Sequence, residues 1–189
     1  MDFASADPSI VRSTRQREML SVWLALYSRI QQIPEFEEFK TNGLTGDLDD
    51  LVFYLVEPHG DGADFLIESD SPRTYQPYGK SGKGRYLHEY LPPKTRDRVM
   101  PVYNECVRKR LPMFTVSRVE AINGAEVEFE RLLLPFADSA GVGRVIASLN
   151  TVSIAGEFEI RHLMKRKEFL PRYDILSVID REAQMADNK

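Results

Sequence analysis

Two β-hairpins that share one strand are predicted in residues 115–152, and they constrain the fold more than any other part of the sequence. Asn123-Gly124 precedes an apolar second strand over 126–134. Asn-Gly is the preferred pair for a tight hairpin turn, because both residues adopt positive φ there. A turn rich in small residues then leads into a third strand over 144–152. The pattern predicts a three-stranded antiparallel meander.

Helices and two further strands are predicted ahead of the meander. A helix over 13–32 begins with a capping-box pattern. The apolar segment 51–56 is typical of a buried strand, and residues 63–69 alternate as a second strand should. Two helices flanked by prolines follow at 85–90 and 95–110.

Two more helices are predicted after the meander. Residues 156–169 carry basic side chains toward the end of the segment, where they complement the helix dipole. Residues 174–184 are interpreted as a second, short helix. Helices and antiparallel strands in this order predict an α+β protein.

Composition and charge narrow the class of protein. The chain has 189 residues, 42% of them apolar, which is enough for one folded core. Its net charge of -4 argues against a nucleic-acid partner. No apolar segment reaches the roughly 20 residues that span a bilayer, and the first residues lack the pattern of a signal peptide. We therefore expect a soluble cytoplasmic protein with no membrane or nucleic-acid partner.

The order of elements resembles the PAS arrangement, and particular residues make the resemblance more specific. Trp23 on the first helix, Gly79, Gly84 and the segment Glu-Arg-Leu-Leu-Leu-Pro-Phe at 130–136 are similar to those of a family of short PAS-related bacterial proteins. The resemblance covers about residues 19–152. It implies a five-stranded antiparallel sheet with helices inserted between strands two and three, plus N-terminal and C-terminal helices. It also implies a sensory or signalling module, for which the family has no established cofactor.

The expected organisation follows from this resemblance. Residues 1–46 would form an N-terminal arm and helix. Residues 47–152 would form the PAS-like domain, with helices on one face of its sheet. Residues 153–189 would form a C-terminal helical extension.

Arg131 is the most informative polar residue of the meander. Strict alternation along the second strand points Val127, Phe129 and Arg131 inward and the neighbouring glutamates outward. An inward arginine beside a cavity would clamp a carboxylate or phosphate. A β-bulge near Glu130 would instead reset the phase and let leucines fill the core. Of the two interpretations, we favour the bulge.

His88 and Tyr103 complete the set of candidate ligand-binding residues with Arg131 and Phe129. His88 lies on the short helix that borders the pocket of a PAS fold, where haem-binding members supply an axial histidine. A half-buried histidine beside Glu89 is the interpretation that we favour. No two histidines share metal-ligand spacing, so we expect no metal and no cofactor.

The first helix carries a wide apolar stripe. Met19, Trp23, Leu26 and Ile30 recur at helical spacing. Such a stripe is buried either against the chain's own sheet or against a second copy. We expect a homodimer in which this helix supplies much of the contact.

The function predicted from the sequence is that of a single-module PAS-like sensory or signalling protein. It would bind a small ligand or a partner protein and shift a conformational or oligomeric equilibrium, without being an enzyme. One alternative is a small enzyme that turns over an anionic metabolite in the pocket. The other is a structural adaptor with a filled core and no ligand.

Overall fold

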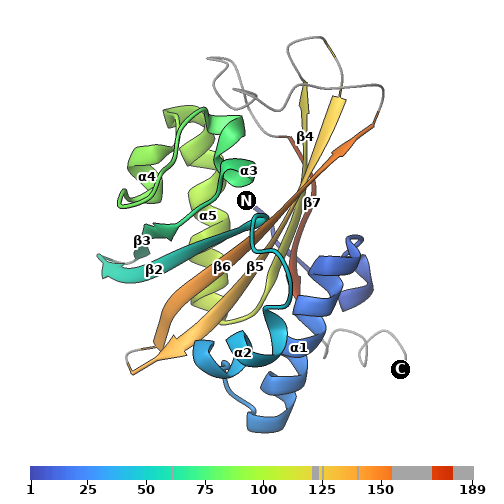
Figure 1. Ribbon diagram of the computed structural model, residues 1–189, viewed down its shortest axis with the longest axis vertical. Helices are drawn as coiled ribbons and strands as arrows, with labels where there is room; N and C mark the ends of the chain where they lie inside the picture. Colours follow the sequence, from blue (N-terminus) through green and yellow to red (C-terminus); the bar gives the residue numbers. More distant parts are fainter. Residues whose placement is uncertain (61, 121–123, 125, 140, 155–171, 181–189) are drawn as a thin grey trace.

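One mixed β-sheet runs through the part of the chain that the structure describes (Figure 1). This computed structural model describes residues 1–60, 62–120, 124, 126–139, 141–154 and 172–180. The strands pair in the order β1-β7-β4-β5-β6-β2-β3, antiparallel throughout except for β1 and β7, which are parallel. They are β1 (Ala4–Ala6), β2 (Leu51–His59), β3 (Gly62–Ser69), β4 (Met113–Glu120), β5 (Glu126–Asp138), β6 (Gly141–Ser153) and β7 (Arg172–Ile179). The predicted α+β class is confirmed.

The five strands predicted between residues 47 and 152 are present and lie next to one another as β3-β2-β6-β5-β4. The meander is confirmed, because β5 pairs antiparallel with both β4 and β6. Gly124, between β4 and β5, has a φ of 83°, as a tight hairpin turn requires; Asn123 lies outside the described residues. The prediction of a sheet limited to five strands is wrong, because β7 and β1 extend it beyond β4.

The prediction of a C-terminal helix is wrong for the segment that becomes β7. This segment pairs with β4 from Arg118↔Arg172 to Met113↔Val178. An uncovered edge strand presents unpaired backbone groups that favour the addition of another strand, and β-branched residues suit that conformation. The helix predicted over 156–169 lies outside the described residues.

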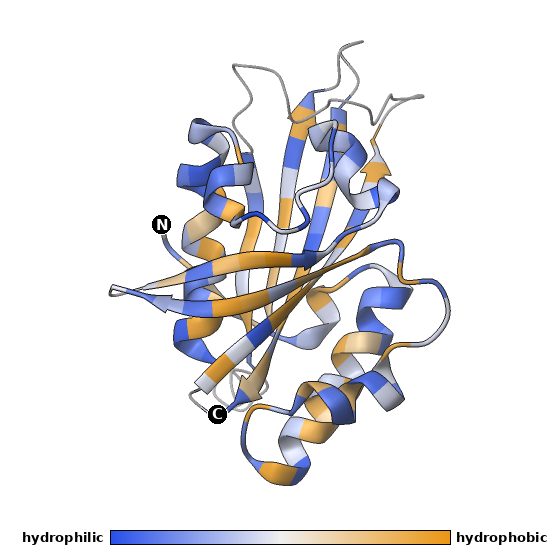
Figure 2. Ribbon diagram, turned by 60° about the vertical axis from the view of Figure 1, so that its left-hand side comes forward, coloured by the Kyte–Doolittle hydropathy of each residue, from blue (hydrophilic) through white to orange (hydrophobic). Residues whose placement is uncertain are grey.

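Helices cover both faces of the sheet (Figure 1). α1 (Thr14–Ile30) and α2 (Phe36–Gly43) pack on one face, with the 3-10 turn η1 (Pro8–Ile10) beside them. The other face carries α3 (Pro72–Tyr75), η2 (Gln76–Tyr78), α4 (Leu87–Tyr90) and α5 (Pro93–Lys109). Leu133 belongs to the α5 layer, and Leu132 and Leu134 belong to the α1 layer. The strands are therefore rich in apolar residues where helices cover both of their faces (Figure 2).

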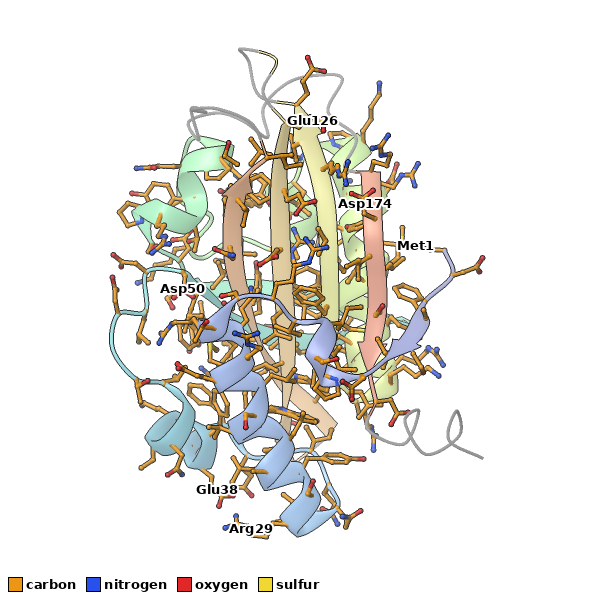
Figure 3. All side chains as sticks on the ribbon, turned by 90° about the vertical axis from the view of Figure 1, so that its right-hand side faces the viewer. Met1, Arg29, Glu38, Asp50, Glu126 and Asp174 are labelled. Carbon is orange, nitrogen blue, oxygen red and sulfur yellow. The ribbon has the colours of Figure 1, made fainter. Side chains whose placement is uncertain are left out.

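α1 lies against the sheet (Figure 3), and this packing buries most of its apolar stripe. Met19, Trp23 and Leu26 are buried within the chain, whereas Ile30 is 38% exposed. The proposed dimer contact through the first three residues is wrong, because the sheet of the same chain already covers them. Dimerisation itself stays a prediction. No helix among the described residues has the length and apolar character to cross a bilayer.

Pro135 lies inside β5 rather than at its end. The pairing of β5 with β4 ends at Met113↔Leu133. Pro135 lies beyond this point, so its lack of an N–H costs no hydrogen bond to β4. The Pro135 carbonyl instead accepts a hydrogen bond from Trp23 Nε1 at 2.8 Å. Next along β5, the Ala137 amide donates to the Pro34 carbonyl at 2.9 Å, so the connection between α1 and α2 pairs with β5 beyond the end of β4. An Arg29–Glu38 ion pair ties α1 to α2 (Figure 3).

Candidate functional site

Arg131 points toward the layer of α3, α4 and α5. β5 pairs with β6 in continuous register over residues 127–136, where Arg131 lies opposite Leu149. Because side chains alternate along an unbroken strand, Arg131 shares a face with Phe129. The bulge near Glu130 that we favoured from the sequence is therefore wrong, since the register shift in β5 lies beyond this range.

A cavity of about 130 Å³ lies between this face of the sheet and the helices above it. α3 and η2 form its roof, and β5 and β6 form its floor. An apolar cavity of about 150 Å³ accommodates benzene, so this cavity admits a ligand of similar size. Its lining residues are Arg73, Thr74, Pro77, Tyr78, Phe129, Arg131, Leu149 and Thr151.

Beyond Arg131 the cavity narrows into an apolar recess of about 20 Å³. α4 and α5 close this recess, and its volume is close to that of one water molecule. Two buried tyrosines lie at its inner end, where the Tyr103 hydroxyl donates to the Tyr54 hydroxyl at 3.3 Å. The apolar side chains around the recess are Val52, Ile67, Leu87, Leu91, Val99 and Leu149.

The guanidinium of Arg131 is buried without a counter-ion. The residue is 8% exposed, and its Nε has no hydrogen-bond partner among the described residues. None of the ion pairs formed by those residues includes Arg131. Neutral groups stabilise the charge instead: Tyr78 forms a side-chain hydrogen bond with the guanidinium, and the ring centroid of Tyr103 lies 5.7 Å from Cζ. Burial lowers the pKa of Arg131, but the surrounding tyrosines raise it above its ordinary value, so the charge persists.

The tyrosines around Arg131 stay protonated at physiological pH. Burial raises the pKa of Tyr54 well above its ordinary value and the pKa of Tyr103 to about 12. Burial also raises the pKa of Tyr78, although the charge of Arg131 opposes the shift. Neutral phenols are hydrogen-bond donors. The site therefore combines a buried permanent cation with neutral donors.

Tyr103→Phe is expected to reduce the loss of stability at alkaline pH. Because burial raises the pKa of Tyr103 from 10.0 to about 12, the unfolded chain releases this proton first as the pH rises. The associated stability is complete below pH 10 and is lost as the pH rises toward 12, to a total of about 2–3 kcal/mol. Urea unfolding at a series of alkaline pH values measures the difference between variant and wild type. Tyr27→Phe, on α1, is the control, and an unchanged pH profile in Tyr103→Phe would contradict the assignment.

His88 is not part of the cavity. Its Nδ1 lies 3.1 Å from Asp64 Oδ1, and its ring stacks on Tyr86 with the centroids 5.7 Å apart. His59 Nδ1 lies 3.3 Å from the other oxygen of Asp64. The partner of His88 is thus Asp64 rather than Glu89, and the pair joins α4 to β3. The other three candidate residues, Arg131, Phe129 and Tyr103, do come together at the cavity and its recess.

Several lining residues were not predicted from the sequence. Arg73, Thr74 and Tyr78 come from a segment rich in Pro, Gly and Ser, whose turns carry no periodic signal. Leu149 and Thr151 lie two positions apart on β6, and only the pairing of β6 with β5 brings them beside Arg131. Among the described residues, no group of three or more His, Cys, Asp or Glu side chains is arranged to hold a metal ion.

Comparison with known proteins leaves the site to be interpreted from its own chemistry. No family model and no curated protein matches the chain. The buried cation, the cavity beside it and the neutral donors around both are the features that indicate a function.

Proposed function

We propose that this chain is a PAS-like sensory module that binds a small organic anion in the cavity at Arg131. Ligand occupancy would alter the position of α3 and η2, which form the roof of the cavity. A signalling partner or a second copy of the chain would respond to that shift of α3 and η2. The module has no catalytic output of its own.

The guanidinium of Arg131 carries this proposal, because it has no counter-ion and its Nε has no hydrogen-bond partner among the described residues. A buried charge without a counter-ion is costly, because it loses hydration and a neutral partner such as Tyr78 replaces only part of that stabilisation. Proteins keep such groups where a ligand supplies the missing partner. A carboxylate in the cavity would accept hydrogen bonds from the planar fork of the guanidinium, including the free Nε.

The topology supports the PAS-like part of the proposal. The adjacent strands β3-β2-β6-β5-β4 are antiparallel, and α3, α4 and α5 are inserted between the second and third of them in chain order. The cavity lies between these helices and the sheet. β1 and β7 are additions at one edge, remote in the strand order from β2 and β3.

The lining of the cavity favours binding over catalysis. Catalysis on an anionic metabolite needs a general base or a nucleophile within reach of the bound molecule. The residues that line the cavity include no carboxylate, imidazole or thiol, and the one carboxylate that lines the recess, Asp70, already accepts from Ser81 Oγ and from the Gly82 amide. The adaptor alternative requires a filled core, whereas the described part of the chain leaves space beside Arg131. Both observations favour reversible ligand binding.

Calorimetric titration of the purified protein with acetate, succinate and inorganic phosphate tests the proposal. We expect at least one of these anions to bind the wild type. Arg131→Met should weaken that binding by roughly 10- to 100-fold, because charge-assisted hydrogen bonds are lost. Arg17→Met is the matched control, since it removes the same charge from an exposed position on α1.

Two results would contradict the proposal. One is the absence of heat and of any shift in thermal stability with all three anions. The other is equal binding by the wild type and Arg131→Met, which would place the anion elsewhere on the surface.

A further inference from the structure

A second guanidinium lies at the same cavity. Arg73 lines it from α3, and this side chain is exposed. α3 is held in place by a reciprocal capping box, in which Ser71 Oγ accepts from the Thr74 amide at 3.3 Å and Thr74 Oγ1 accepts from the Ser71 amide at 3.0 Å. The cap fixes the backbone of the two residues between them, Pro72 and Arg73, and Arg73 lines the cavity. Arg73 forms none of the ion pairs found among the described residues.

Two acidic residues, Asp47 and Asp50, line a neighbouring depression together with Arg73, and both already have partners. Asp50 Oδ1 lies 3.4 Å from Arg15 Nε, and its Oδ2 accepts from Ser148 Oγ at 3.1 Å. Asp47 Oδ1 accepts from the Asp49 amide at 2.9 Å. Arg73 is therefore available to a ligand at the mouth of the cavity.

The two cations differ in depth, and apolar surface separates the polar groups. Arg131 is buried at the floor and is desolvated, whereas Arg73 is at the solvent-exposed roof. Phe129, Leu149 and Pro77 supply apolar surface to the same cavity. A matching ligand has an anionic group at each end and a short apolar body between them.

We propose that the ligand is a short dicarboxylate that bridges Arg131 and Arg73, an inference that depends on the proposed anion site. The deep carboxylate pairs with Arg131 through the fork of the guanidinium. The carbon chain lies along Phe129 and Leu149, and the second carboxylate meets Arg73 at the mouth. The cavity volume of about 130 Å³ limits the chain to about four or five carbons. Inorganic phosphate has no carbon chain to lie along the apolar lining, and a monocarboxylate pairs only with the deep cation.

Succinate and its monomethyl ester distinguish the two cations, because they have nearly the same length but differ by one charge. We expect the wild type to bind succinate more tightly than the ester by roughly two- to fivefold, the effect of one solvent-exposed ion pair. Arg73→Gln should abolish this difference while leaving the affinity for the ester unchanged. Arg73→Lys should retain part of the difference, since it keeps the charge. Titration at low and at moderate salt should show a larger difference at low salt.

The other outcomes of these titrations distinguish a failure of the dicarboxylate assignment from a failure of the proposed function. A preference for succinate that persists in Arg73→Gln would overturn the dicarboxylate assignment and leave the anion site at Arg131 intact. Tighter binding of inorganic phosphate than of succinate would also overturn it, in favour of a compact anion. Failure of every anion to bind the wild type would instead contradict the proposed function itself.

Discussion

Trp23→Ala is expected to lower the free energy of unfolding by about 3–5 kcal/mol. The Trp23 side chain is fully buried and stacks on Tyr27 with the ring centroids 5.2 Å apart. The substitution removes this packing and also leaves the buried carbonyl of Pro135 without its hydrogen bond from Nε1. Urea unfolding followed by circular dichroism measures the loss.

Trp23→Phe is the control for this substitution, because it keeps an aromatic ring but not the donor. We expect it to be less destabilising than alanine. Trp23→Asp, followed by light scattering, addresses the predicted homodimer: with α1 in the core, this variant should unfold more easily rather than become a stable monomer. A folded Trp23→Asp protein with wild-type stability would mean that α1 is an interface after all.

Arg131→Met is expected to raise the stability of the ligand-free protein by about 1–4 kcal/mol while weakening anion binding. Methionine fills a similar volume, can pack against Phe129 and Tyr103, and removes a buried charge whose Nε has no partner. The opposite signs for stability and binding are the signature of a group retained for its ligand. Thermal unfolding with and without succinate measures both quantities on one sample.

Arg131→Lys tests whether the shape of the cation matters as well as its charge. It keeps the buried charge, so we expect no gain in stability, and it loses the planar fork, so we expect weaker binding than in the wild type. If Arg131→Met instead unfolds at a lower temperature than the wild type, Arg131 stabilises the fold. The inference that Arg131 is retained for a ligand is then wrong.

The part of the fold that could be predicted from the sequence is the part specified by local patterns. Alternation and the Asn123-Gly124 pair predicted the meander, and the apolar segments predicted β2 and β3. The same patterns did not predict β7. An eight-residue segment such as Arg172–Ile179 has no strong period, and its state depends on the open edge of β4, which is distant in sequence.

The candidate site shows the same division. Alternation along the strand predicted that Arg131 points inward. The leucines at 132–134 are apolar on both faces of the strand, so they did not distinguish alternation from a bulge. They are apolar because α1 and α5 cover opposite faces of β5, which is a tertiary fact. Likewise, Arg73 joins the cavity only because a capped turn of helix lies above the sheet.

The sequence by itself determined that the chain folds into an antiparallel meander with an amphipathic first helix that must be buried. Only the tertiary structure decided that Trp23 packs on the chain's own sheet and that a strand completes the edge of β4. It also decided that Arg131 faces a cavity without a counter-ion. The reason is physical: periodicity reports which side of a strand or helix is buried, but not which distant segment covers it.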